Sequence, residues 1–448
     1  MKKLILIAIT SALFAPCAVN VNALDNKSAP TMSSQMNLTF DGFGTKVLHI
    51  TGIGTVHINW GDGTLVEVHN LTVQKSLVNA SHHYSKVATY TIKIDGEQII
   101  SLQCANNQLT ALDVRNNSAL RALNCDGNQL KILDVRKNSV LTRLACSNNR
   151  LKKLDVSHNR ALTNLSCNAN QIADLDVDNN IALTTLSCKV NEIKILNLRN
   201  NRSLQNLSLD KNQITTLDVS KNVALSLLMV SDNQLFALDV SENRLLTSLG
   251  CMNNRLTKLD LRNNIALRSL VCANNALIDI DISKNEALEL LVCDQNQLTS
   301  LDLEKHILLK YLRCSYNQLS NLMVNSAALE LLDCSHNRLM SLDVAKSLVL
   351  TKLYCFYNQL STLDMSQNIA LTNLMCANNQ LTSLKVNNNS PLTSLSCSMN
   401  RLSVDELNDL FESLHAMPIT KTISIAGNSG TTQCDKTIAQ NKGWRVNP

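Results

Sequence analysis

Residues 144–157 read LACSNNRLKKLDVS, and variants of this stretch recur every 21 residues over about two thirds of the 448-residue chain. The shared template is L-x-C-x-x-N-x-L-x-x-L-D-V-x-x-N, and its first asparagine is present in every copy from Asn107 to Asn400. One step is shorter, because Cys314 and Cys334 are 20 residues apart. A fixed period of this length predicts a solenoid in which each repeat forms one coil. The first leucines of the copies are Leu102, Leu123, Leu144, Leu165, Leu186, Leu207, Leu228, Leu249, Leu270, Leu291, Leu312, Leu332, Leu353, Leu374 and Leu395.

One coil shows how the repeat folds. Leu123 and Cys125 alternate with polar residues, so we expect a short strand that points both of them inward. Asn128 then turns the chain, and its carboxamide satisfies turn backbone that would otherwise be buried and unpaired. Because no coil encloses its own apolar side chains, the coils must stack. The fold class is therefore an α/β-type but mostly β solenoid, a curved leucine-rich-repeat array of about 15 coils with its parallel sheet on the concave face.

The cysteines occupy one position of the repeat. Where cysteine is absent, Leu209 or Val230 replaces it, which indicates a position that needs an apolar filler, as a buried free thiol provides. Disulfides between neighbouring coils are disfavoured, since side chains of a parallel ladder point the same way. A metal site is disfavoured because no C-x-x-C pair occurs. The 13 ladder cysteines are Cys104, Cys125, Cys146, Cys167, Cys188, Cys251, Cys272, Cys293, Cys314, Cys334, Cys355, Cys376 and Cys397.

The chain begins with an export signal. Lys2 and Lys3 precede an apolar run that is too short to span a bilayer, and the small-residue pattern ending at Ala23 predicts cleavage there. Residues 1–23 are thus a signal peptide and residues 24–35 a linker. Lipid attachment at Cys17 is the alternative, although Pro16 gives it a poor sequence context. The net charge of +5 falls to +3 when the two lysines leave. No later segment is apolar enough for a membrane helix, so we expect a secreted or cell-surface protein.

A small β unit is predicted at residues 36–97, ahead of the repeat solenoid at residues 98–402. Alternating apolar residues predict strands at 47–50, 55–58 and 89–94, with residues 60–63, WGDG, forming a turn. This turn, the HHY of residues 82–84 and the TYTI of residues 89–92 resemble a PKD-type, Ig-like module. We expect the unit to cover the apolar end of the first coil. Asp62 and His82 are interpreted as structural, with calcium binding by Asp62 as the alternative.

Residues 403–448 are predicted to cap the other end of the array. Ser403-Val404-Asp405-Glu406 forms a capping box, and the apolar residues at 407, 410, 411 and 414 follow at helical spacing. A strand at 422–425, a turn at 427–430 and a short helix at 435–441 complete this unit. Cys434 stands outside the ladder and has no evident partner.

The whole pattern is similar to that of exported leucine-rich-repeat proteins of the Bacteroidetes and, more distantly, to Listeria proteins of the internalin J type. The residues that carry the resemblance are the 21-residue units with cysteine, such as 144–157, and it covers about residues 24–448. The resemblance implies an adhesin or a ligand-binding surface protein, and it specifies the fold better than the partner. Internalins carry a cell-wall anchoring tail, which we do not expect for this sequence.

A change in composition suggests where a partner binds. The outward strand positions are small and polar in early repeats, for example Ser166 and Ser208, and we expect these positions to be free of structural roles. In the eleventh to thirteenth repeats they hold five of the six aromatic residues of the array, the sixth being Phe236. Aromatic and arginine side chains most often anchor interfaces. The alternative is drift at unconstrained positions. The candidate partner-binding residues are Tyr311, Arg313, Tyr316, Leu331, Asp333, His336, Lys352, Tyr354, Phe356 and Tyr357. An apolar stretch before them, Leu227, Met229, Leu290 and Val292, is a candidate extension.

The leading function is therefore a monomeric protein-binding adhesin, with a host or bacterial surface protein as partner. Glycan binding is the alternative, because aromatic platforms also stack on sugars. No basic run suggests nucleic acid. We expect no catalytic residues, no metal and no cofactor, since the histidines stand at scattered repeat offsets and no Ser/His/Asp, Cys/His or paired-carboxylate pattern recurs.

Overall fold

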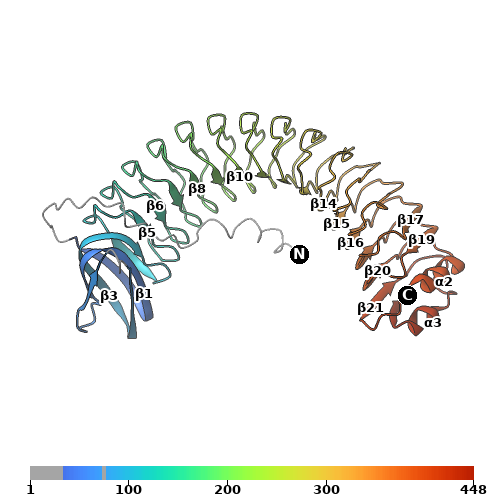
Figure 1. Cartoon of the computed structure of the whole chain (residues 1–448), viewed down its shortest axis with the longest axis horizontal. Helices are drawn as coiled ribbons and strands as arrows, with labels where there is room; N and C mark the ends of the chain where they lie inside the picture. Colours follow the sequence, from blue (N-terminus) through green and yellow to red (C-terminus); the bar gives the residue numbers. More distant parts are fainter. Residues whose placement is uncertain (1–33, 73–76) are drawn as a thin grey trace. The chain divides into compact units, whose positions relative to one another are not determined.

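The computed structural model describes residues 34–72 and 77–448 and divides into two compact units. The first unit ends at Leu141 and the second comprises Thr142–Pro448. Figure 1 shows both, with the β-rich first unit in blue and cyan. The predicted signal peptide at residues 1–23 and nearly all of the predicted linker lie outside the described residues.

The first unit is built on two long strands. β1 (Met36–Asn59) runs antiparallel to β3 (Leu77–Gln103) and also pairs with β2 (Glu67–Leu71) and β4 (Leu109–Asp113). Alternate residues of β1 and β3 are buried, which is the pattern that predicted strands here. The separate strands expected at 47–50 and 55–58 are two parts of one strand, because β1 continues through register shifts instead of turning.

The WGDG turn is fixed by side-chain contacts. The Asp62 carboxylate accepts hydrogen bonds from the backbone and hydroxyl of Thr64 and lies 2.7 Å from Nε2 of His82. The hydrogen bond from the Thr64 hydroxyl lowers the pKa of Asp62 to about 2, and the bond to His82 acts in the same direction. The His82 ring stacks on Trp60, whose carbonyl accepts a 2.6 Å hydrogen bond from the buried hydroxyl of Tyr84. These contacts explain Asp62 and His82 as structural residues.

β1 also covers the first coils, as the sequence predicted. The end of β3 is the first ladder strand, since Ser101–Gln103 pairs in parallel with β5 (Ala122–Asn124) and antiparallel with β1. On the same side, the Asn107 side chain donates to the carbonyl of Val47 at 2.7 Å and accepts from its N–H at 2.9 Å. β1 therefore takes the place that a preceding coil would fill.

The second unit is a stack of coils. Each contributes a short strand that pairs in parallel with the next, in register, and Figure 1 shows these strands along the inner side of the curved stack. The strands are β6 (Arg143–Ala145), β7 (Asn164–Ser166), β8 (Thr185–Ser187), β9 (Asn206–Ser208), β10 (Leu227–Met229), β11 (Ser248–Gly250), β12 (Ser269–Val271), β13 (Leu290–Val292), β14 (Tyr311–Arg313), β15 (Leu331–Asp333), β16 (Lys352–Tyr354), β18 (Asn373–Met375) and β20 (Ser394–Ser396). A second, two-stranded sheet joins β17 (Thr362–Met365) to β19 (Ser383–Val386) on the other wall.

The inward cysteines form the predicted ladder. All 13 are free thiols without exposed surface. At the two positions without cysteine, Leu209 is also fully buried and Val230 is 1% exposed. Burial raises the pKa of the Cys251 and Cys397 thiols to about 12. The ladder is thus an apolar filler made of buried free thiols.

Two rows of asparagine tie the coils together. The strand-side asparagines, which run from Asn107 to Asn400, use both ends of the carboxamide. Asn296, for example, donates to the carbonyls of Cys272 and Cys293, both at 3.1 Å, and accepts from the N–H of Leu277 at 3.1 Å. The turn-side asparagines stand at the last position of the template. Within the second unit Asn159, Asn180, Asn201, Asn222, Asn243, Asn264, Asn285 and Asn368 have no exposed surface, whereas Asn389, at the same template position, is exposed.

The C-terminal cap begins as predicted. α2 (Val404–Ser413) starts at Ser403, whose side chain accepts from the N–H of Glu406, and buries Leu407, Leu410 and Phe411. α3 (Lys436–Asn441) begins at Asp435.

The ladder nevertheless continues beyond the last predicted repeat. β21 (Lys421–Ser424) pairs with β20, and β22 (Trp444–Asn447) pairs with β21. Asn428 acts as a further strand-side asparagine, since it donates to the carbonyls of Cys397 and Ile425. The template is lost here, but the coil and its polar contacts persist.

Candidate functional site

The candidate partner-binding residues come from three adjacent coils. β14, β15 and β16 lie side by side and carry Tyr311, Arg313, Leu331, Asp333, Lys352 and Tyr354, which we call the strand-face residues. Each strand buries its central leucine and turns the two flanking side chains outward. The remaining four residues follow the strands on the turns of the same coils.

These four residues, Tyr316, His336, Phe356 and Tyr357, form a ring cluster. The ring of His336 stacks between those of Tyr316, with centroids 3.9 Å apart and planes 12° apart, and Tyr357, at 4.5 Å and 18°. Phe356 meets the His336 ring at its edge, with centroids 5.2 Å apart. Burial lowers the pKa of His336 from its ordinary value of 6.5, which favours the neutral ring.

Backbone geometry explains why the rings align. Tyr316, His336 and Tyr357 occupy the same position of successive coils, and all three have left-handed φ angles of 52° to 54°. This conformation costs a residue other than glycine or asparagine about 1 kcal/mol or more. The fold imposes it on every coil, and other coils meet it with residues such as Asn148 or Gly127. Three consecutive aromatic residues at this position set these coils apart.

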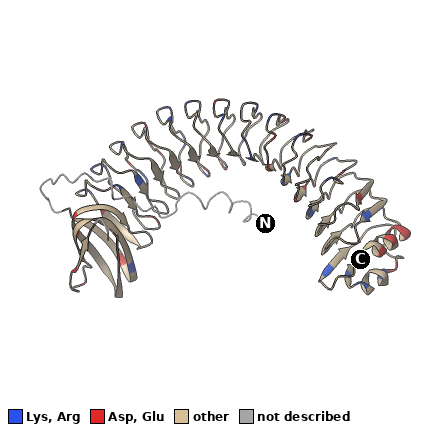
Figure 2. Cartoon of the chain, in the orientation of Figure 1, with Lys and Arg blue, Asp and Glu red and all other residues tan. Residues whose placement is uncertain are grey.

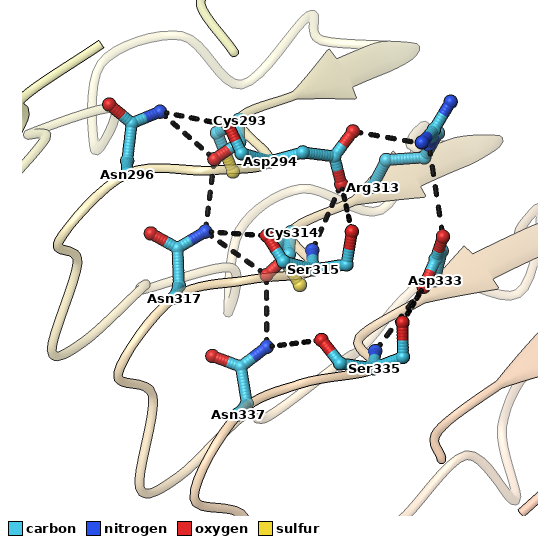
Figure 3. A network of polar contacts seen from close by, with 10 residues as sticks. All are labelled: Cys293, Asp294, Asn296, Arg313, Cys314, Ser315, Asn317, Asp333, Ser335 and Asn337. Atoms are coloured by element: carbon cyan, nitrogen blue, oxygen red, sulfur yellow. Dashed lines mark hydrogen bonds and ion pairs between the residues drawn. The ribbon is translucent and has the colours of Figure 1, made fainter. Parts of the chain in front are cut away.

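Arg313 lies between two carboxylates. Its Nε is 3.2 Å from Asp294 Oδ2 and 3.9 Å from Asp333 Oδ2, as Figure 3 shows. Asp294 is buried, and burial raises its pKa although Arg313 opposes the shift. The arginine charge is therefore balanced within the chain.

The carboxylates also support the turns, as the dashed lines in Figure 3 indicate. Asp333 accepts from the backbone at 3.2 Å and from the hydroxyl at 2.7 Å of Ser335, and Asp294 makes the same pair of bonds with Ser315. The expectation that outward strand positions have no structural role is therefore wrong for Asp333. In these two coils the N–H that follows the strand needs an acceptor, and an outward carboxylate supplies it.

Charged groups flank the strand face. Tyr311 donates from its hydroxyl to Glu330 at 2.6 Å, which raises the tyrosine pKa. Glu289 binds both Arg268 and Lys310 at 2.8 Å. Lys352 is exposed and forms no ion pair with any described residue. The strand face thus presents the exposed Lys352 beside apolar and aromatic side chains.

In the early repeats, the outward strand positions Ser166 and Ser208 were expected to be free of structural roles, and the structure contradicts this. Ser166 and Ser208 are 3% and 2% exposed, because neighbouring side chains cover them. Ser166 also hydrogen-bonds to Ser147 at 2.8 Å and Asn168 at 3.1 Å. These two positions are therefore closed to a partner, whereas the outward Asn164 and Asn206 of the same strands are half-buried.

The apolar stretch is only partly accessible. Leu227, Met229 and Leu290 are half-buried, whereas Val292 is 5% exposed. A side chain at Gly250 would collide with the Met229 sulfur, so the methionine lies over this glycine. The stretch adjoins the candidate surface through pairing of Val292 with Arg313.

The structure thus brings the ring cluster together, and separately joins Arg313 to Asp333. Tyr311 does not join the ring cluster, because its hydroxyl binds Glu330. Sequence reasoning missed Asp294 and Glu330 as partners. Asp294 stands at an outward position one coil earlier, and Glu330 immediately precedes Leu331. Their positions in the repeat place both next to the candidate residues, and this could have identified them from the sequence.

Within the described residues, no cluster of three histidine, cysteine or acidic side chains is suited to hold a metal ion. No helix in that part of the chain is long and apolar enough to cross a bilayer. Figure 2 shows Lys/Arg and Asp/Glu interspersed along the second unit, with acidic residues on α2.

Solved structures share this architecture. The functional domain of InlJ from Listeria monocytogenes, which includes a cysteine ladder, is 34% identical with a TM-score of 0.66, over 76% of this chain and 77% of that one. The leucine-rich-repeat protein LIC12759 from Leptospira interrogans is 20% identical with a TM-score of 0.65, over 77% of this chain and 95% of that one. The ectodomain of the receptor kinase GASSHO1/SCHENGEN3 from Arabidopsis thaliana, solved with CASPARIAN STRIP INTEGRITY FACTOR 2, is 20% identical with a TM-score of 0.52, over 71% of this chain and 48% of that one. The last two show the fold alone. No protein-family model and no curated protein sequence matches the chain.

Proposed function

Because the chain belongs to the cysteine-ladder leucine-rich-repeat family of internalin J, we propose that it is an exported scaffold that binds a protein partner, as an adhesin of the cell surface or a secreted protein. The repeat array is the scaffold, and the strand-face residues with the ring cluster form the binding surface. The predicted signal peptide at residues 1–23 supports export. The PKD-like unit of residues 36–97 is proposed to cap the array.

The observation that carries the proposal is the ring cluster. It gathers aromatic area at one place in an array where tyrosine and phenylalanine are otherwise rare, and Tyr316 and Tyr357 remain 52% and 50% exposed. Rigid aromatic surface beside charged groups is typical of residues that dominate protein interfaces. The complex of GASSHO1/SCHENGEN3 with CASPARIAN STRIP INTEGRITY FACTOR 2 is an instance of binding by the same fold.

The direction of the rings favours protein over glycan. A sugar stacks on the flat face of an aromatic ring, but both faces of His336 are covered by Tyr316 and Tyr357. The inner faces of the two tyrosines are covered in the same contacts. What the cluster offers is mainly ring edges and hydroxyls, which suit the mixed polar and apolar side chains of a protein.

Capture of cell-surface proteins by the purified protein, with a glycan array run in parallel, tests the proposal. The variant that combines Tyr354→Ala and Phe356→Ala should lose the captured protein, while Phe236→Ala, an exposed aromatic outside the strands, should retain it. Binding that appears only on the glycan array, or capture that survives the double substitution, would contradict the proposal.

A further inference from the structure

The row of turn-side asparagines is interrupted behind the candidate surface. In a regular coil the side chain donates twice to the preceding coil, as Asn285 does to the carbonyls of Leu261 at 3.1 Å and Asn264 at 2.8 Å. Asn368 resumes this pattern. The three coils between them carry His306, Ser326 and Ser347 instead.

The replacements donate fewer hydrogen bonds to the preceding coil than asparagine does. Ser347 makes one bond to the preceding coil, to the carbonyl of Ser326 at 2.9 Å, where an asparagine makes two. The Ser326 hydroxyl has a single proton to share between two carbonyls of the preceding coil, those of Ile307 at 2.9 Å and Leu309 at 2.7 Å. The coil between Cys314 and Cys334 is also the one that is a residue short. The paired asparagine donors are therefore missing over three consecutive coils.

His306 is the unusual member of the set. The residue is 1% exposed, and neither ring nitrogen makes a well-aligned hydrogen bond to any described residue. The carbonyl of Ile282 and the carboxylates of Asp302 and Glu286 favour a charged ring, but burial has the larger effect and lowers the pKa from 6.5. Glu286 is shared with Lys305, whose Nζ lies 3.8 Å away. The neutral ring is thus the form that the fold accommodates.

We propose that His306 makes this segment of the array acid-labile: protonation places a charge in a site with one carbonyl within reach, and the turn around residues 303–309 opens. Asn285 and Asn368, on either side of this segment, keep their paired bonds to the preceding coil, and their coils stay closed. Opening exposes backbone next to β14, the first strand of the candidate surface. The inference concerns the fold and holds whether or not that surface binds a partner.

The direction of the pH dependence follows from linkage. The folded state binds the proton less well than the unfolded state, so the neutral ring contributes its full stability above pH 6.5. This contribution is lost as the pH falls below 6.5 and through the lowered value of the folded state. Local opening should increase in the same range.

Hydrogen exchange of the whole protein at pH 7.5 and 5.0, normalised to the intrinsic exchange rate at each pH, measures the opening. Peptides that cover residues 303–309 should lose protection by up to about thirtyfold at pH 5.0, the limit for one proton whose unfolded-state pKa is 6.5. Peptides that cover residues 240–246, around Asn243, should not change. In His306→Asn the acid-induced loss of protection should disappear, because the new side chain does not titrate and its carboxamide can donate to the preceding coil as the other turn-side asparagines do.

Two further variants decide between alternatives. His336→Asn, which removes the half-buried histidine of the ring cluster, should leave the loss intact. Asn264→His should create a second acid-labile turn in a regular part of the row. The inference is overturned if wild-type protection at residues 303–309 does not change with pH, if the loss persists in His306→Asn, if it vanishes in His336→Asn, or if Asn264→His gains no acid sensitivity.

Discussion

The ring of His336 lies flat on the ring of Tyr316, with centroids 3.9 Å apart and planes 12° apart. Neighbouring strands of a sheet are about 4.8 Å apart, so identical positions of adjacent coils hold rings close to stacking distance. The stack with Tyr357 is thus a direct result of the repeat, once three successive coils place aromatic residues at one position.

Tyr316→Asn should remove this stack with little effect on folding. Loss of the ring contact costs about 0.5–1.5 kcal/mol, and asparagine recovers about 1 kcal/mol because it tolerates the left-handed backbone better. Asn148, Asn253 and Asn274 already occupy this position in other coils. The free energy of unfolding, measured with urea, should therefore change by less than about 1 kcal/mol. A larger loss would mean that the stack supports the array.

The thiol ladder predicts a difference between folded and unfolded protein. A bulky thiol reagent should label none of the 13 ladder cysteines in the native state, and all of them after denaturation, because they are buried and burial raises the pKa of thiols such as Cys251 and Cys397. Disulfides between successive ladder cysteines, found by mass spectrometry, would contradict this.

Substitutions at Cys272 test the same position energetically. Cys272→Val should cost less than about 1.5 kcal/mol, since Val230 is accommodated at the equivalent place. Cys272→Asp should cost several kcal/mol, because it buries a carboxyl group without a partner. Equal costs for the two variants would show that the position does not discriminate by polarity.

Each strand-side asparagine should contribute several kcal/mol to the free energy of unfolding. Asn296→Ala leaves the carbonyls of Cys272 and Cys293 and the N–H of Leu277 without this partner, and each buried group costs about 1–3 kcal/mol. A loss of more than about 3 kcal/mol is therefore expected in urea unfolding. The neighbouring Gln297→Ala, at an exposed residue, is the control and should change stability by less than about 0.5 kcal/mol.

Removal of residues 403–448 should cause aggregation. The deletion strips β21 and α2 from the last coils and leaves the edge of β20 unpaired. Light scattering of the truncated protein measures the effect. A truncated chain that stays monomeric and unfolds like the complete one would show that the capping assignment is wrong.

Much of the fold follows from the repeat alone, because each coil reuses one set of inward leucines, cysteine and asparagine. Contacts outside the template were less accessible to sequence reasoning. β22 was missed since Trp444–Asn447 lacks the leucine and cysteine of the template, although the strand pairs in register with β21. The long β1 was divided into shorter strands because register shifts inside a strand leave no clear mark in the sequence.

The candidate site shows the same limit. Repeat position identified Tyr316, His336 and Tyr357 as outward residues, but their stacking required the backbone angle and ring planes. The structural role of Asp333 depends on the N–H of Ser335, which no periodicity reveals. The burial of Ser166 and Ser208 also came from their neighbours.

The central claim is that this surface anchors a protein partner, and the affinity of a captured partner for Tyr354→Ala and Phe356→Ala tests it most directly. Each substitution should weaken binding by more than about 1 kcal/mol, while the melting temperature stays near that of the wild type, because both side chains lie outside the ladder core. Phe236→Ala should bind as the wild type does. Unchanged affinity in both strand-face variants, or an equal loss in Phe236→Ala, would contradict the claim.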